Sequence, residues 1–146
     1  MLRIALISYE FPPSVAIGGI GSYTWEAAQM LAHAGCFVEV FSAGEATDEI
    51  AECFGVEVHR VPTCNRSSFG ELVCNVFEAR HLAEPFNLIE SPEICAEGAW
   101  IASRFPELPF VVKLHTPTYL VGLAGVDRPS HLDRLRYRLG ALRRGR

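Results

Sequence analysis

Four consecutive residues, Gly18-Gly19-Ile20-Gly21, stand directly before a segment with helical periodicity. Glycine lets the backbone approach a ligand closely, and the first amides of a helix are unpaired donors at the positive end of its dipole. Such a loop suits phosphate, carboxylate or sugar oxygens. By itself it is equally consistent with a flexible turn that needs a positive φ, so other residues must decide.

Two nucleotide-binding motifs to which this loop could belong do not fit well. The dinucleotide fingerprint matches only in its first two glycines, because Thr24 stands where the third small residue belongs. Phe41-Ser42 also occupies the region where an acidic ribose ligand is expected. A dinucleotide-dependent oxidoreductase therefore stays an alternative only. The phosphate-binding loop of nucleoside triphosphatases is excluded, because no Gly-Lys pair is followed by Ser or Thr.

Three further polar residues follow apolar runs, where strands are expected to end. His115 could hydrogen-bond a hydroxyl or a phosphate, or it could be a structural histidine. Glu90 and Glu93 could bind substrate hydroxyls or act as acid or base, and Glu93 could equally cap the next helix. Ligands of open parallel sheets bind beyond the carboxyl ends of the strands, so these residues and the glycine loop should face one crevice.

The elements that must position these residues alternate between strand and helix. Short apolar runs predict strands, and apolar residues at helical spacing predict helices. The strands are expected at 2–8, 37–42, 56–61, 86–90 and 110–115, and the helices at 22–34, 47–54, 72–83 and 94–105. Ser22 is expected to cap the first helix and Gly35 to end it. This order predicts an α/β fold, a Rossmann-like three-layer sandwich with a parallel sheet.

Length, composition and charge narrow the function classes. The 146 residues allow one domain, 1–146, and 49% hydrophobic with 21% charged residues is typical of a globular chain. A net charge of −4 argues against general nucleic-acid binding. The five cysteines form no C-x-x-C pair, which favours free, mostly packed thiols, no metal site and a cytoplasmic setting.

The C-terminal segment has a different charge from the rest. Seven arginines and two aspartates lie between Asp127 and Arg146, against six basic and fifteen acidic residues up to Val126. An amphipathic helix is expected from Ser130, with an apolar stripe of Leu132, Leu135, Leu139 and Leu142. Its arginine-rich face, within 128–146, could contact anionic lipid at the inner membrane surface.

The sequence resembles the N-terminal domain of GT-B glycosyltransferases of the glycogen synthase-like family 4 (group 1), over residues 1–126. Three motifs carry the resemblance, in the same order: Tyr9-Glu10-Phe11-Pro12-Pro13, the glycine loop with Tyr23, and His115-Thr116-Pro117. The resemblance implies the N-terminal half of a GT-B fold. The chain would then be an acceptor-side domain, a fragment that lacks the C-terminal donor-binding domain and is inactive alone.

The resemblance also implies an activity and roles for the matching residues. The activity is transfer of a sugar from a nucleotide-sugar donor to an acceptor hydroxyl with retention of configuration, without a metal or another cofactor. His115 would be catalytic and contact the transferred sugar. The implied donor-binding residues are Gly18, Gly19 and Gly21, and the acceptor-binding residues are Glu93 and Tyr23. A non-catalytic α/β module that binds a small molecule remains the main alternative.

Overall fold

The computed structural model describes residues 1–15, 18–45, 51–53 and 55–115. These residues form a six-stranded sheet of order β3-β4-β2-β1-β5-β6. β3 is antiparallel to β4, and the other neighbours pair in parallel. The strands are β1 (Arg3–Ile7), β2 (Phe37–Gly44), β3 (Ala51–Cys53), β4 (Val56–Pro62), β5 (Leu88–Pro92) and β6 (Phe110–Lys113).

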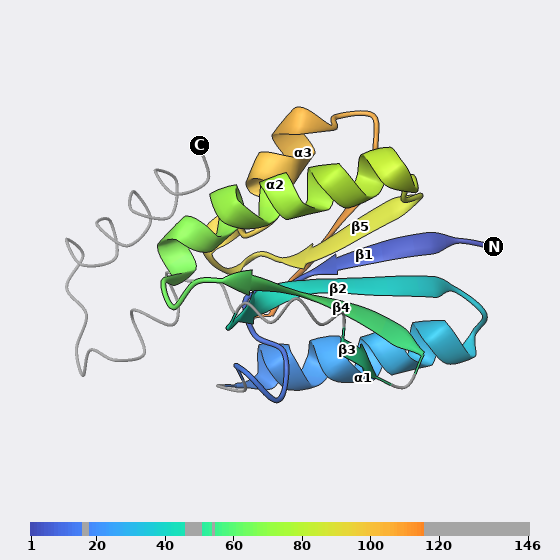
Figure 1. Ribbon diagram of the computed structural model, residues 1–146, viewed down its shortest axis with the longest axis horizontal. Helices are drawn as coiled ribbons and strands as arrows, with labels where there is room; N and C mark the ends of the chain where they lie inside the picture. Colours follow the sequence, from blue (N-terminus) through green and yellow to red (C-terminus); the bar gives the residue numbers. More distant parts are fainter. Residues whose placement is uncertain (16–17, 46–50, 54, 116–146) are drawn as a thin grey trace.

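Helices cover both faces of the sheet. They are α1 (Gly19–His33), α2 (Arg66–Ala83), the 3-10 helix η1 (Ile94–Ala96) and α3 (Ala99–Arg104). α1 lies against one face, and α2 and α3 lie against the other (Figure 1). The predicted α/β, Rossmann-like three-layer architecture is therefore confirmed.

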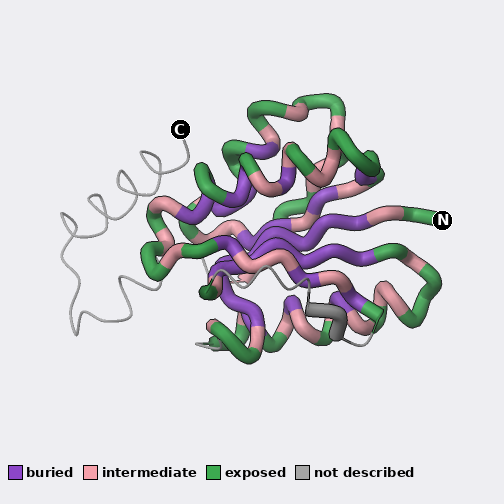
Figure 2. The backbone as a smooth tube through the Cα atoms, viewed as in Figure 1, coloured by how far each residue is buried: buried purple, intermediate pink, exposed green. Residues whose placement is uncertain are grey.

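The central strands are buried on both faces, as the purple strands of Figure 2 show. Successive side chains of a strand point to opposite faces. Ala5, Ile7 and Phe41 accordingly belong to the core on the α2 side, and Leu6 and Val40 belong to the core on the α1 side. Burial on both faces explains why these strands read as continuous apolar runs.

Both long helices begin earlier than their apolar stripes indicate. α1 begins at Gly19, with Gly18 as its N-cap residue, so the prediction that Ser22 caps this helix is wrong. α2 begins at Arg66 because the Asn65 side chain accepts a hydrogen bond from the Ser67 backbone N–H. The predicted stop at Gly35 is confirmed, since its φ is +84°.

Two predicted helices differ from the structure. Within 47–54, residues 51–53 form the edge strand β3, paired antiparallel with the start of β4. The predicted helix 94–105 is interrupted, because Cys95 and Ala96 have φ values of 55° and 51°. Only the short α3 continues after this break. Positive φ values at two successive residues are incompatible with one continuous α-helix.

Several predictions concern residues outside the described part of the chain. They are the helix from Ser130, the arginine-rich segment 128–146 and the Thr116-Pro117 end of the third motif. Among the described residues, no helix is both long enough and apolar enough to span a membrane. The cysteines whose side chains the structure describes, Cys36, Cys64, Cys74 and Cys95, are free, but only Cys74 among them is buried, so the prediction that they are mostly packed is wrong.

Candidate active site

The carboxyl ends of β5 and β6 bring His115 and Glu93 together. β6 pairs in parallel with β5, so both residues follow strands that end at the same edge of the sheet. The His115 backbone N–H donates to Glu93 Oε2 at 2.9 Å, and the Glu93 N–H donates to the Lys113 carbonyl at 3.2 Å. The Glu93 side chain makes no capping bond to η1. It binds the backbone of His115 instead.

Tyr23 reaches the same place from α1. Its ring lies edge-on to the His115 ring, with 5.2 Å between the ring centres. The Tyr23 hydroxyl donates to Glu90 Oε1 at 2.7 Å, and Lys113 Nζ lies 4.6 Å from the centre of the Tyr23 ring. Burial, together with the Glu90 hydrogen bond and charge, raises the pKa of Tyr23 to about 12. Tyr23 is therefore a neutral hydrogen-bonding group at physiological pH.

Two polar atoms in this cluster have no hydrogen-bond partner among the described residues. They are His115 Nε2 and Glu93 Oε1, and both are buried. An imidazole nitrogen can donate or accept according to its tautomer, and a carboxylate oxygen accepts. Buried polar atoms are nearly always paired in folded proteins. Each of the two atoms therefore has hydrogen-bonding capacity that the described residues do not use.

The glycine loop forms the N-terminus of α1, next to Tyr23. Gly18 makes no side-chain cap bond, and Gly18 and Gly19 are exposed. Gly21 is buried, and a Cβ there would lie 3.4 Å from Glu10 Cβ and 3.7 Å from the Val15 carbonyl oxygen. The first turn of α1 thus packs directly on the preceding turn, and the first amides of a helix have no acceptor in a preceding helical turn.

A buried ionic network beneath this loop was not predicted from the sequence. Arg66 NH2 lies 2.6 Å from Glu10 Oε1, and Arg66 Nε lies 3.1 Å from Glu97 Oε1. Glu97 Oε2 accepts from the Tyr9 backbone N–H at 2.8 Å. Burial raises the pKa of Glu97 to about 7, against the opposing effects of that hydrogen bond and of Arg66. Glu97 is therefore a carboxyl group that titrates near neutral pH.

The sequence offered only part of the signal for this network. Glu10 stands inside the first resemblance motif, which marked its position but not its role. Glu97 lies in a segment predicted to be helical, where an acidic residue is expected to face solvent. In the structure, however, Glu97 is only 1% exposed. Its burial results from the break at Cys95 and Ala96, and nothing in the local sequence announces that break.

A pocket of about 540 Å³ opens between α2 and α3, beside this network. Trp100, which is 57% exposed, and Arg66 contribute its largest side chains. Gly70 makes room for Trp100, because a Cβ at Gly70 would lie 3.2 Å from Trp100 Cδ1. The remaining lining residues are Ser67, Cys95, Ala96, Ala99 and Ser103. The pocket is large enough for a ring-sized group.

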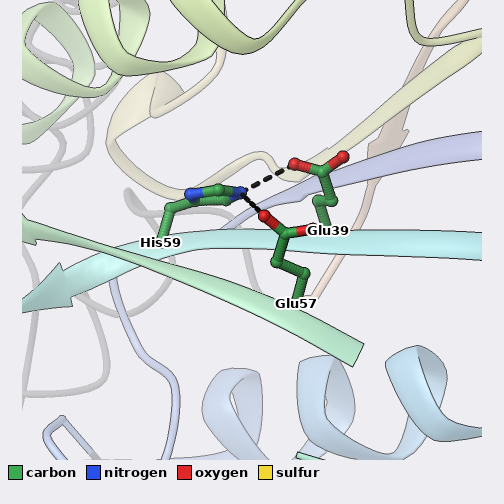
Figure 3. A group of neighbouring side chains, drawn as sticks. All are labelled: Glu39, Glu57 and His59. Atoms are coloured by element: carbon green, nitrogen blue, oxygen red, sulfur yellow. Dashed lines mark hydrogen bonds and ion pairs between the residues drawn. The ribbon is translucent and has the colours of Figure 1, made fainter. Parts of the chain in front are cut away.

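A second polar cluster lies at the amino end of the strands. The ligand atoms of Glu39, Glu57 and His59 lie within 4.8 Å of one another, and these are donor types that a divalent cation accepts. His59 Nε2 contacts Glu39 Oε2 at 2.7 Å and Glu57 Oε1 at 3.4 Å (Figure 3). However, both Glu39 oxygens accept from Arg80, at 2.9 and 3.0 Å, and Arg3 also pairs with Glu39. The guanidinium groups occupy the carboxylate, so we interpret this cluster as structural.

The structure brings together the residues that the sequence singled out. His115, Tyr23 and Glu93 form one cluster, and Tyr23 stands on the turn of α1 that follows Gly19.

Comparison with known proteins identifies the family of the chain. The glycosyl transferase 4-like domain family matches residues 18–145 of the chain. No curated protein matches the sequence.

Two solved structures of sucrose-phosphate synthase from Thermosynechococcus elongatus are similar to this chain. The first has a TM-score of 0.69 at 18% identity and is matched over 97% of this chain and 40% of its own. The second has a TM-score of 0.56 at 19% identity, over 78% of this chain and 64% of its own. At these identities the likeness shows the fold, and the chain spans less than half of the first structure. Because the family match extends over most of its length, the chain belongs to the glycosyl transferase 4-like domain family.

Proposed function

We propose that residues 1–146 are the N-terminal, acceptor-side domain of a retaining glycosyltransferase. The enzyme would transfer a sugar from a nucleotide-sugar donor to an acceptor hydroxyl, without a metal or another cofactor. The observation that carries this proposal is the cluster of His115, Tyr23 and Glu93 beside the uncapped N-terminus of α1. Membership of the glycosyl transferase 4-like domain family supports it.

In this proposal the glycine loop and His115 serve the donor. Gly18, Gly19 and Gly21 bring the backbone and the positive end of α1 close to the donor diphosphate, which gains negative charge as it departs. His115 Nε2, which has no partner among the described residues, hydrogen-bonds the transferred sugar. Preorganised donors of this kind stabilise charge that develops in the transition state.

The acceptor is proposed to lie on the Glu93 and Tyr23 side of the cluster. Glu93 Oε1 has no described partner and can accept a bond from an acceptor hydroxyl. The neutral Tyr23 belongs to the same cluster. The pocket beside Arg66 and Trp100 is lined by none of the cluster residues, but its lining includes Cys95, two residues after Glu93, and we propose it as the place for the rest of an acceptor. A C-terminal domain would supply the remaining donor contacts. We also propose a cytoplasmic location and membrane contact through 128–146. We propose no nucleic-acid partner.

Substitution of His115 by Ala in the full-length enzyme tests this function. Product formation is measured with UDP-, ADP- and GDP-sugars, and the anomeric configuration of the product is read by NMR. Loss of one stabilising hydrogen bond in a transition state costs roughly 10²–10³ in kcat, so we expect a fall of about that size with little change in Tm. His33→Ala is the matched control, because His33 is exposed on α1.

Two results would count against the proposal. Near-normal turnover of His115→Ala with a clearly lower Tm would make His115 a structural residue, because loss of a packed ring leaves a cavity and an unpaired partner. Binding of a sugar nucleotide with no transfer to any acceptor would favour a non-catalytic binding module.

A further inference from the structure

Arg60 of β4 binds the backbone of the turn at residues 11–15, which precedes the glycine loop. Arg60 NH1 donates to the Phe11 carbonyl at 2.9 Å, and Arg60 NH2 donates to the Pro12 carbonyl at 2.7 Å. The guanidinium also lies 5.4 Å from the centre of the Phe11 ring. On the sheet side, NH1 donates to Ser42 Oγ at 2.7 Å. One side chain thus joins this turn to β2 and β4.

The turn needs a donor from outside itself. Pro12 and Pro13 have no backbone N–H, so neither of these successive residues can donate a backbone hydrogen bond that holds the turn. Among the described residues, the turn's own backbone supplies one bond, from the Val15 N–H to the Phe11 carbonyl at 3.2 Å. A carbonyl oxygen has two lone pairs, so the Phe11 oxygen can accept from both Val15 and Arg60.

The chain leaves space for the Arg60 side chain at Gly44. A Cβ at Gly44 would lie 2.8 Å from Arg60 Cδ and 3.3 Å from Ser14 Cβ. Such a contact would displace the middle of the Arg60 side chain, whose far end is fixed by the hydrogen bonds above. Gly44 is the last residue of β2, in register with Pro62 of β4, and its closeness to Ser14 places this gap beside the turn.

We propose that Arg60 is a positioning residue that sets the place of the glycine loop. The coupling passes through the turn, because Gly21 packs against Glu10 and the Val15 carbonyl, on either side of the residues that Arg60 holds. Displacement of this turn moves the first amides of α1. The effect on donor binding rests on the proposed function, whereas the effect on the backbone does not.

Arg60→Lys and Gly44→Ala test this inference in the full-length protein. A lysine keeps the charge but has one nitrogen, which cannot reproduce the contacts that NH1 and NH2 make together. Hydrogen exchange is measured by mass spectrometry, and donor KM and kcat are measured with the sugar nucleotide that supports turnover. The matched control is Arg104→Lys, because Arg104 pairs with Glu78 on the α2 and α3 side.

We expect faster exchange of the amides of residues 18–24 in both variants, with α2 unchanged. We also expect a donor KM raised about tenfold, because misplaced amides lose roughly one hydrogen bond to the donor, and a tenfold change corresponds to about 1.4 kcal/mol. A merely structural role would reduce the amount of active enzyme, and hence apparent kcat, and would leave the donor KM unchanged.

Unaltered exchange at 18–24 in Arg60→Lys would overturn the inference, whatever the kinetics show. Faster exchange with an unchanged donor KM would overturn the link from the turn to donor binding. If the wild-type enzyme transfers no sugar, the proposed function fails. The exchange measurement alone then decides whether Arg60 positions the loop.

Discussion

The two ends of the sheet carry polar clusters of opposite character. At the amino end, both oxygens of Glu39 are bonded, by Arg80, Arg3 and His59, and the buried atom without a partner among the described residues is Arg3 Nε, a nitrogen of one of these cations. At the carboxyl end, Glu93 Oε1 and His115 Nε2 are buried without a partner among the described residues. A buried charge that keeps its partners avoids the cost of an uncompensated charge, whereas an unpaired buried polar atom lowers stability unless a ligand pairs it. The comparison shows a carboxylate saturated by cations at one end and a carboxylate with one open oxygen at the other; that the second end binds substrate is part of the proposed function.

Two buried carboxyl groups, Glu39 at the amino end and Glu97 beneath the glycine loop, have pKa values shifted in opposite directions. Glu39 has a pKa of about 2, because the bonds and charges of His59 and Arg80 outweigh its burial. Its stabilising contribution is present above about pH 4.5 and is lost as the pH falls toward 2. Glu97 has a pKa of about 7, because burial dominates. Its ionisation therefore reduces stability as the pH rises from about 4.5 to 7.

The largest effect is expected for Glu39→Gln. Removal of this charge leaves the two arginines without their shared partner, and breaking a buried ion pair on one side costs roughly 3–5 kcal/mol. Urea unfolding at pH 7 measures the loss, and the gap between variant and wild type should narrow toward pH 3.

A matched control for this prediction is Glu84→Gln. Glu84 also pairs with Arg3, but its side chain is 56% exposed. We expect a change below about 1 kcal/mol for an exposed pair. Equal losses in the two variants would contradict the structural role given to the amino end.

Glu97→Gln should show a smaller effect with the opposite dependence on pH. Glutamine removes the titration, so the free energy of unfolding of the variant should improve relative to wild type by roughly 2 kcal/mol between pH 5 and pH 8. Parallel unfolding experiments at the two pH values measure this difference. A difference that does not change with pH would mean that Glu97 keeps an ordinary pKa.

Tyr23→Phe sharpens the comparison at the carboxyl end. Loss of the hydroxyl removes the hydrogen bond to Glu90, whose side chain is half-buried, at a cost of about 1 kcal/mol. The Tm should therefore fall by roughly 2–4 °C, and if Tyr23 lines the acceptor site the acceptor KM should rise as well. Unfolding curves and acceptor titrations of the same variant separate the two quantities. An unchanged acceptor KM would remove Tyr23 from the proposed acceptor site.

The smallest effect is expected for Arg104→Ala. Arg104 NH2 lies 2.7 Å from Glu78 Oε1, but the Arg104 side chain is 54% exposed. Surface ion pairs contribute roughly 0.2–1 kcal/mol. A loss comparable with that of Glu39→Gln in the same unfolding assay would show that burial does not determine how much an ion pair stabilises this protein.

The fold was predictable where one physical signal dominates. The parallel strands are buried on both faces, so their apolar runs were recognised in the sequence. The strand β3 was missed because Gly55, with a φ of +77°, ends a helix as readily as it forms the turn between two antiparallel strands. Its pairing with β4 is a tertiary contact that local sequence does not encode.

The site was predictable only in part. The rule that ligands bind beyond the carboxyl ends of strands correctly brought His115 and Glu93 together. The bond from Glu93 to the backbone of His115 depends on the registers of β5 and β6, which periodicity does not give. Arg60 and Glu97 were missed because each acts on a segment far away in sequence.

The start of α1 has a consequence for any attempt to make this protein more thermostable. Gly18 has extended backbone angles, φ −164° and ψ −162°, and a Cβ there would meet Glu10 Oε2 at an ordinary 3.6 Å. Serine or asparagine therefore fits at this position and would cap the helix, with a gain of a few tenths of a kcal/mol. A screen for heat resistance would select that substitution. Its oxygen would bond the same amides that the donor needs in the proposed function, so under that proposal selection for stability and selection for activity would choose different residues at position 18.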